Sequence, residues 1–219
     1  MGLADSRIAA VVLAAGLSAR MGRPKSLLPL GGKPLLGHVI EAIVSAGKTE
    51  RIEPIVVVIG HAAQEVGKIL QSFPVHPVHN PAYATGGMLS SVQTGVAAVM
   101  GKADAFFVVL GDQPMVRPAT LAAMAAAWRE QRPRVLLPTF DGKHGHPILL
   151  SVEGADEILS LPPDATLKSY TSRQSERTSE VAIDDPAVLA DIDTPADYQA
   201  AVERLTQKQN PSGRSNSCS

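Results

Sequence analysis

The chain has 219 residues, of which 45% are hydrophobic and only 4% aromatic, so its core must consist mainly of aliphatic side chains. Its 20 Lys and Arg residues balance 21 Asp and Glu residues, and a net charge of −1 at pH 7 gives no sign of a nucleic-acid surface. No apolar run reaches the length of a membrane span. The only cysteine, Cys218, excludes an intrachain disulfide and favours a reducing, cytoplasmic setting.

A chain of this length suits one domain, which we expect over residues 1–206, followed by a tail (207–219) whose Ser, Asn and Gly content predicts disorder. Within the domain, strands are expected at 8–15, 55–59, 75–79, 105–110, 135–137, 147–150 and 181–183. Helices are expected at 34–46, 62–71, 88–100, 118–129, 153–160, 165–173 and 195–205. Gly47 is expected to end the first helix. Because strands that alternate with helices form βαβ units, we predict an α/β fold, a Rossmann-like three-layer sandwich with a mostly parallel sheet.

The strand at 8–15 leads into a loop of small residues that carries three cations, Arg20, Arg23 and Lys25. Ligands of open α/β sheets bind at the carboxyl ends of strands. Small residues let backbone N–H groups approach phosphate oxygens, and cations neutralise their charge. We therefore interpret this stretch as a phosphate-binding loop, with an ordinary strand-to-helix turn as the alternative. It matches neither the dinucleotide fingerprint nor the Walker A loop, because the spacing after Gly16 differs from both.

Two acidic positions are expected near this loop, and the first of them is a candidate for a metal site. Asp112 directly follows the apolar strand at 105–110 and therefore faces the same crevice. Its carboxylate suits Mg²⁺, which prefers hard oxygen ligands and commonly takes others from substrate phosphates. A turn or helix-capping role is the alternative. Asp193 stands just before the helix at 195–205, where it either turns inward or caps that helix.

A turn-rich loop at 80–87 supplies glycines and serines to the start of the helix at 88–100. Unpaired N–H groups at a helix start, together with hydroxyls, can bind the base and ribose of a nucleotide. The candidates are the pairs Gly86-Gly87 and Ser90-Ser91, and simple helix capping is the alternative.

Four motifs, in their order along the chain, resemble those of the MobA-like nucleotidyltransferase family. They are L-A-A-G-L-S-A-R-M-G-R-P-K at 13–25, G-M-L-S-S at 87–91, G-D-Q-P at 111–114 and D-I-D-T-P-A-D at 191–197. The resemblance covers most of residues 8–205 and implies a fold like that of the nucleotide-diphospho-sugar transferases. It also implies a nucleotide-binding site formed by Leu13, Ala14, Ala15, Gly16, Ser18, Arg20, Met21, Gly22, Lys25, Gly86, Ser91 and Asp112.

The resemblance further implies roles for individual side chains in a transfer reaction. Arg20 and Lys25 would be catalytic, with Arg20 neutralising the departing pyrophosphate and Lys25 bridging the α-phosphate and the incoming phosphate. Asp112 and Asp193 would hold Mg²⁺ against the α-phosphate, and Asp191 is the reserve candidate. A phosphate monoester is already nucleophilic, so positioning and charge neutralisation would supply the catalysis.

Within the family, the motifs look most like those of the molybdenum cofactor cytidylyltransferase branch, which transfers CMP from CTP to the terminal phosphate of a molybdopterin-type cofactor. Ala15 favours CTP, because guanylyl relatives typically carry glycine there. The resemblance also implies an apo-molybdoenzyme as a further partner. On the acceptor side it points to His146, in a G-H-P segment. A segment typical of this branch is replaced by residues 162–168, where Asp164 and Lys168 are candidate acceptor ligands.

That replacement leaves other functions open. The same fold could use GTP in place of CTP, or act on a sugar phosphate or a polyol phosphate. A non-enzymatic carrier of the cofactor is the alternative from another class, although a carrier would not need the catalytic cations together with both aspartates. An oxidoreductase is disfavoured, because the dinucleotide fingerprint is missing.

Overall fold

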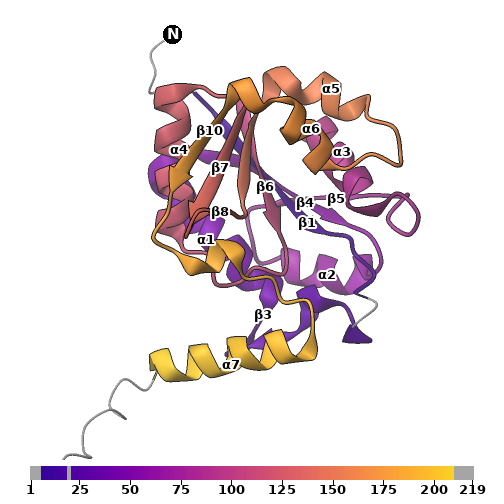
Figure 1. Cartoon of the computed structure of the whole chain (residues 1–219). Coiled ribbons are helices and arrows are strands. Elements are labelled where there is room, and N and C mark those ends of the chain that lie inside the picture. The colour runs from indigo at the N-terminus through magenta and orange to yellow at the C-terminus, as the bar shows by residue number, and fades with distance from the viewer. Residues whose placement is uncertain (1–5, 19–20, 210–219) are drawn as a thin grey trace, which may run out of the picture.

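The computed structural model describes residues 6–18 and 21–209 (Figure 1). Its strands are β1 (Ile8–Ala14), β2 (Pro29–Leu30), β3 (Lys33–Pro34), β4 (Ile52–Ile59), β5 (His76–His79), β6 (Ala105–Leu110), β7 (Val135–Phe140), β8 (Lys143–His144), β9 (Ile148–Ser151) and β10 (Thr178–Ala182). Its α-helices are α1 (Leu35–Glu50), α2 (Ala63–Leu70), α3 (Gly87–Val99), α4 (Pro118–Gln131), α5 (Ala155–Leu159), α6 (Leu167–Arg173) and α7 (Pro195–Gln209).

The main sheet has the strand order β10-β7-β9-β6-β1-β4-β5, and β8 pairs with β7. β6, β1, β4 and β5 run parallel to one another, and β10 runs parallel to β7. β9 is antiparallel to both of its neighbours, β6 and β7. The predicted α/β fold with a mostly parallel sheet is confirmed, and β1 lies inside the parallel part.

Helices cover both faces of this sheet, which gives three layers (Figure 1). Successive side chains of a strand point to opposite faces, and β1 illustrates this rule. Ile8, Ala10 and Val12 pack in one apolar cluster with residues of α1, α2 and α4. Ala9 and Val11 pack in a second cluster with residues of α3, α5 and α6. A strand buried on both faces has the continuous apolar run that the sequence shows.

Gly47 does not end the first helix, contrary to the prediction. α1 continues to Glu50 and stops before Arg51, which adopts a left-handed backbone conformation with φ of 50°. Gly47 instead makes room for the chain that enters β4, because a Cβ at this position would lie only 3.2 Å from the carbonyl oxygen of Ile52. The glycine therefore meets a packing requirement within the helix.

Two later elements differ in extent from the predicted ranges. The strand expected at 181–183 is β10, which begins at Thr178 because it pairs in parallel register with β7, with Thr178 opposite Val135. The helix expected at 153–160 is confined to α5, because a 3₁₀ turn over Val152–Gly154 precedes it.

α7 lies beside the small antiparallel hairpin of β2 and β3 (Figure 1). A third apolar cluster joins them and includes Leu28, Leu30, Leu35, Ile192 and Ala201. The helix runs past residue 206, and residues 210–219 of the expected tail lie outside the described part of the chain. Among the helices that the structure describes, none combines the length and the apolar character needed to cross a membrane.

Candidate active site

Three segments that are distant in the sequence meet at the carboxyl ends of β1 and β6. The two strands pair in parallel register, with Leu13 opposite Leu110, so their outgoing loops leave the sheet side by side. The backbone N–H of Gly111 donates to the carbonyl oxygen of Leu13 over 3.0 Å, and a Cβ at position 111 would lie 2.7 Å from that oxygen. The third segment precedes α7, and its Ile192 N–H donates to the carbonyl oxygen of Asp112 over 3.3 Å.

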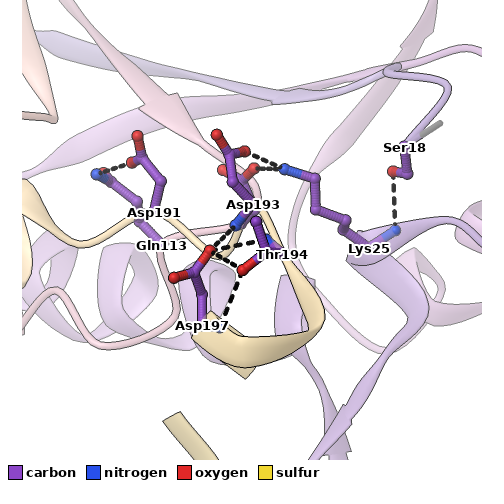
Figure 2. Close-up of polar contacts among 8 residues, drawn as sticks. Ser18, Lys25, Gln113, Asp191, Asp193, Thr194 and Asp197 are labelled. Atoms are coloured by element: carbon purple, nitrogen blue, oxygen red, sulfur yellow. Dashed lines mark hydrogen bonds and ion pairs between the residues drawn. The ribbon is translucent and has the colours of Figure 1, made fainter. Parts of the chain in front are cut away.

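Lys25 joins these three segments through its ammonium group (Figure 2). Its Nζ donates to Oδ2 of Asp112 over 2.6 Å and to Oδ1 of Asp193 over 2.7 Å. The Lys25 side chain is 16% exposed, against 23% for Asp112 and 44% for Asp193. Burial lowers the pKa of Lys25, but the hydrogen bonds and charges of the two aspartates outweigh burial and raise the pKa above its ordinary value. The ammonium group therefore stays charged between the two carboxylates.

Ser18 connects the two described parts of the loop between β1 and Lys25. Ser18 adopts a left-handed conformation with φ of 52°, and Gly22 does so with φ of 66°. The Ser18 hydroxyl accepts a hydrogen bond from the backbone N–H of Lys25 over 2.9 Å, and the Ser18 carbonyl oxygen accepts one from Met21 over 2.9 Å. Arg20 lies outside the described residues, so its catalytic role stays a prediction.

A hydrogen-bonded turn at the start of α7 sets the direction of Asp193 (Figure 2). Oδ2 of Asp197 accepts from the backbone N–H groups of Asp193 (3.1 Å) and Thr194 (2.7 Å), and the Thr194 hydroxyl accepts from the backbone N–H of Asp197 (3.2 Å). The hydrogen bonds from Thr194, and then that from Asp193, lower the pKa of Asp197. Because Thr194 and Asp197 cap the helix, the Asp193 carboxylate turns toward Lys25.

Asp191 belongs to the same segment but is held by a different partner (Figure 2). Nε2 of the buried Gln113 donates to Oδ1 of Asp191 over 2.6 Å. Burial and the nearby charge of Asp112 raise the pKa of Asp191. Burial lowers the pKa of His146. The negative charges of Asp191 and Asp112 raise that pKa, but by less than burial lowers it. Gln113 was not among the predicted site residues, although its place beside Asp112 in the G-D-Q-P motif was a signal.

A cavity of about 570 Å³ opens over this cluster. Predicted nucleotide and metal residues that line it are Leu13, Ala14, Ala15, Gly16, Ser18, Lys25, Ser91, Asp112 and Asp193. The reserve candidate Asp191 lines it as well. Met21 and Gly22 are not among its lining residues, and Gly86 lines the neighbouring cavity instead. The structure therefore brings most, but not all, of the predicted residues to one place.

A second, larger cavity of about 980 Å³ adjoins the first, and Gly87 and Met88 line both. Of the predicted acceptor residues, His146 and Lys168 line this second cavity. Asp164 does not, although both of its chain neighbours do. Two of the three predicted acceptor residues therefore line the second cavity.

Two further groups, outside the predicted site residues, also line the cavities. Tyr83 lines the first, where the centre of its ring lies 6.2 Å from the rings of His61 and of His79. His144 and Glu180 line the second, with His144 Nε2 and Glu180 Oε1 2.7 Å apart. These contacts join separate strands and loops, so no local sequence pattern indicates them.

Asp112 and Asp193 are two neighbouring carboxylates that could hold a metal ion. Their carboxylate oxygens already share one cation, the Lys25 ammonium group. Over residues 6–18 and 21–209, no group of three or more His, Cys, Asp or Glu side chains is arranged as a metal site. A metal ion held by the two aspartates would therefore need further ligands from substrate or water, as Mg²⁺ commonly does.

Comparisons with known proteins identify the family. The family model described as the MobA-like NTP transferase domain matches residues 10–181. A molybdenum cofactor cytidylyltransferase from Escherichia coli (strain K12) is 29% identical, over 92% of this chain and 99% of its own length. A solved nucleotidyl transferase from Methanothermobacter has a TM-score of 0.78 and 27% identity, over 93% of this chain and 99% of that chain. The solved complex of Rv0371c from Mycobacterium tuberculosis H37Rv with manganese has a TM-score of 0.70 and 28% identity, over 90% and 98%. The chain therefore has a fold like that of the nucleotide-diphospho-sugar transferases and belongs to the MobA-like NTP transferase family.

Proposed function

We propose that this protein transfers CMP from CTP to the terminal phosphate of a molybdopterin-type cofactor and releases pyrophosphate. The observation that carries the proposal is the Lys25 ammonium group, held between Asp112 and Asp193 beside two adjoining cavities. A transfer of this kind needs a nucleotide and an acceptor side by side. The Escherichia coli relative supports the reaction, and Ala15 supports CTP as the nucleotide.

The first cavity takes the nucleotide in this proposal. Leu17 and Met88, which are 45% and 57% exposed, line it beside the charged cluster. Because both side chains line this cavity, they offer apolar surface to a nucleotide base there. Residues 15–18 line this cavity and offer backbone N–H groups to the β- and γ-phosphates, and Ser91 offers its hydroxyl to the base.

An oxygen of the acceptor phosphate attacks the α-phosphorus of CTP. A new P–O bond forms there, and the bond from the α-phosphorus to the bridging oxygen of the departing pyrophosphate breaks. The attacking oxygen is already anionic, so the chain needs no general base. Lys25 neutralises charge at the α-phosphate, and we assign the charge on pyrophosphate to Arg20.

We propose Mg²⁺ as the cofactor, with Asp112 and Asp193 as its protein ligands. Their two carboxylate oxygens already bind one cation, the Lys25 ammonium group, and hard oxygen ligands of this kind suit Mg²⁺. When bound, Mg²⁺ supplies positive charge against the phosphate oxygens. The manganese complex of the mycobacterial relative supports a divalent cation for this chain as well.

The second cavity takes the acceptor. Lys168 offers a cation to an acceptor phosphate, and His146 lines the same cavity. His144 and Glu180 offer hydrogen bonds to the polar body of the acceptor. Because Gly87 and Met88 line both cavities, an acceptor phosphate in the second cavity can approach a nucleotide in the first. We propose the cytoplasm as the location, where a single cysteine stays reduced.

The test measures pyrophosphate release with CTP, GTP, ATP and UTP in turn, each with Mg²⁺ and a molybdopterin-type acceptor. We expect release with CTP alone, and none from the Lys25→Met variant under the same conditions. Release with GTP alone would make the protein a guanylyltransferase. Nucleotide binding without any release would reject the acceptor and direct attention to the second cavity.

A further inference from the structure

Asn80 directly follows β5, is only 1% exposed, and uses every polar group of its side chain. Its Oδ1 accepts a hydrogen bond from the backbone N–H of Ala82 over 2.9 Å. A backbone N–H can only donate, so this contact settles which end of the amide is the oxygen. The Nδ2 group therefore faces two serines and donates to Oγ of Ser90 (2.9 Å) and Oγ of Ser91 (3.0 Å).

The two serines differ in where their own protons go. The Ser90 hydroxyl donates to the carbonyl oxygen of Gly87 over 3.0 Å. The Ser91 hydroxyl accepts from Asn80, and within the described part of the chain no acceptor receives its proton. Ser91 is 6% exposed and lines the 570 Å³ cavity, whereas Ser90 does not. Ser91 therefore presents a hydrogen-bond donor to whatever occupies that cavity.

We propose that Asn80 is a positioning residue for the nucleotide, because its amide makes the Ser91 hydroxyl a donor to the nucleobase. This inference rests on the proposed nucleotide site. A base edge that presents acceptors, such as the ring carbonyl and ring nitrogen of cytosine, pairs with that hydroxyl. The N1–H and N2–H groups of guanine offer no acceptor for the proton of that hydroxyl. Asn80 thus favours a base with an acceptor at this point, because it occupies one lone pair of Ser91 and leaves the hydroxyl proton free for the base.

The test compares CTP binding, by titration calorimetry, in the wild type, Asn80→Asp, Ser91→Ala and the double variant. Asn80→Asp keeps the shape and the acceptor for Ala82, but replaces the Nδ2 donor with an acceptor, which draws the Ser91 proton away from the cavity. Each single substitution should weaken CTP binding by about tenfold, the worth of one hydrogen bond. The double variant should bind no more weakly than Ser91→Ala, because Asn80 acts through Ser91.

Ser90→Ala is the matched control, since it removes the other partner of Asn80 without touching the cavity. It should leave CTP affinity within about threefold of the wild type, well below the loss of one hydrogen bond. If Asn80→Asp does not fold, Asn80→Ala takes its place in the same cycle. The inference would be overturned if the Asn80 variant bound CTP with wild-type affinity. It would also be overturned if adding the Asn80 substitution to Ser91→Ala weakened CTP binding as much as it does in the wild type. A wild-type protein that binds no nucleoside triphosphate would instead reject the proposed function.

Discussion

Replacing Lys25 with methionine removes the charge that holds Asp112 and Asp193 together and keeps most of the length of the side chain. The two carboxylate oxygens lie no further apart than the sum of their distances to Nζ, 2.6 Å and 2.7 Å. At a separation of about 5 Å, two unit charges repel by about 3 kcal/mol at an effective dielectric constant of about 20. Asp193 is 44% exposed, so solvent screening should reduce the loss in the free energy of unfolding to about 1 kcal/mol.

The chemical consequence of Lys25→Met should be much larger than the structural one. Removing one group aimed at developing charge typically lowers turnover by about 10²–10³-fold. Urea unfolding at pH 7 measures the first effect, and pyrophosphate release with CTP measures the second. Lys33→Met is the matched control, because Lys33 pairs with Glu41 on the surface and is 54% exposed. The control should change stability by less than about 1 kcal/mol and leave turnover intact.

The pH dependence of stability gives the sign of the Lys25 interaction. The pKa of Lys25 is raised in the folded protein, so its contribution is present below the unfolded value of 10.5 and is lost as the pH rises through the folded value. The Lys25→Met variant should not show this loss of stability at alkaline pH. Unchanged stability at pH 7, an unchanged alkaline profile and near-normal turnover would together refute the reasoning about this residue.

Three further substitutions test other parts of the site. Gly111→Ala should cost about 1–3 kcal/mol in thermal unfolding, because the added Cβ would lie 2.7 Å from the carbonyl oxygen of Leu13; an unchanged melting temperature would disprove that close approach. Asp197→Asn should destabilise the protein at neutral pH. The lowered pKa of Asp197 means that its contribution is present above the unfolded value of 3.8 and is lost as the pH falls below it, so acid titration should bring the variant and the wild type together. Lys168→Ala should raise the KM for the acceptor by about tenfold, the worth of one charge-assisted hydrogen bond, and leave CTP binding unchanged; weaker CTP binding would show that the two cavities do not act separately.

Much of the site could be predicted from the sequence because of one property of parallel sheets. The strands that precede the loop at 15–25 and Asp112 are continuous apolar runs, so both were recognisable as buried strands. Parallel neighbours end at the same edge of a sheet, and the register of Leu13 opposite Leu110 brings the two loops together. The family motifs then added Asp193 and Ser91, which no periodicity indicated.

The sequence by itself therefore determined the α/β fold, the strand-end location of the site and most of the residues around the first cavity. Only the tertiary structure decided the contacts between side chains: Lys25 between Asp112 and Asp193, Gln113 on Asp191, and His144 on Glu180. The physical reason is that such contacts join residues far apart in the chain. Their distances depend on strand register, helix packing and capping turns such as that of Asp197, whereas a local pattern reports only on its own strand, helix or turn.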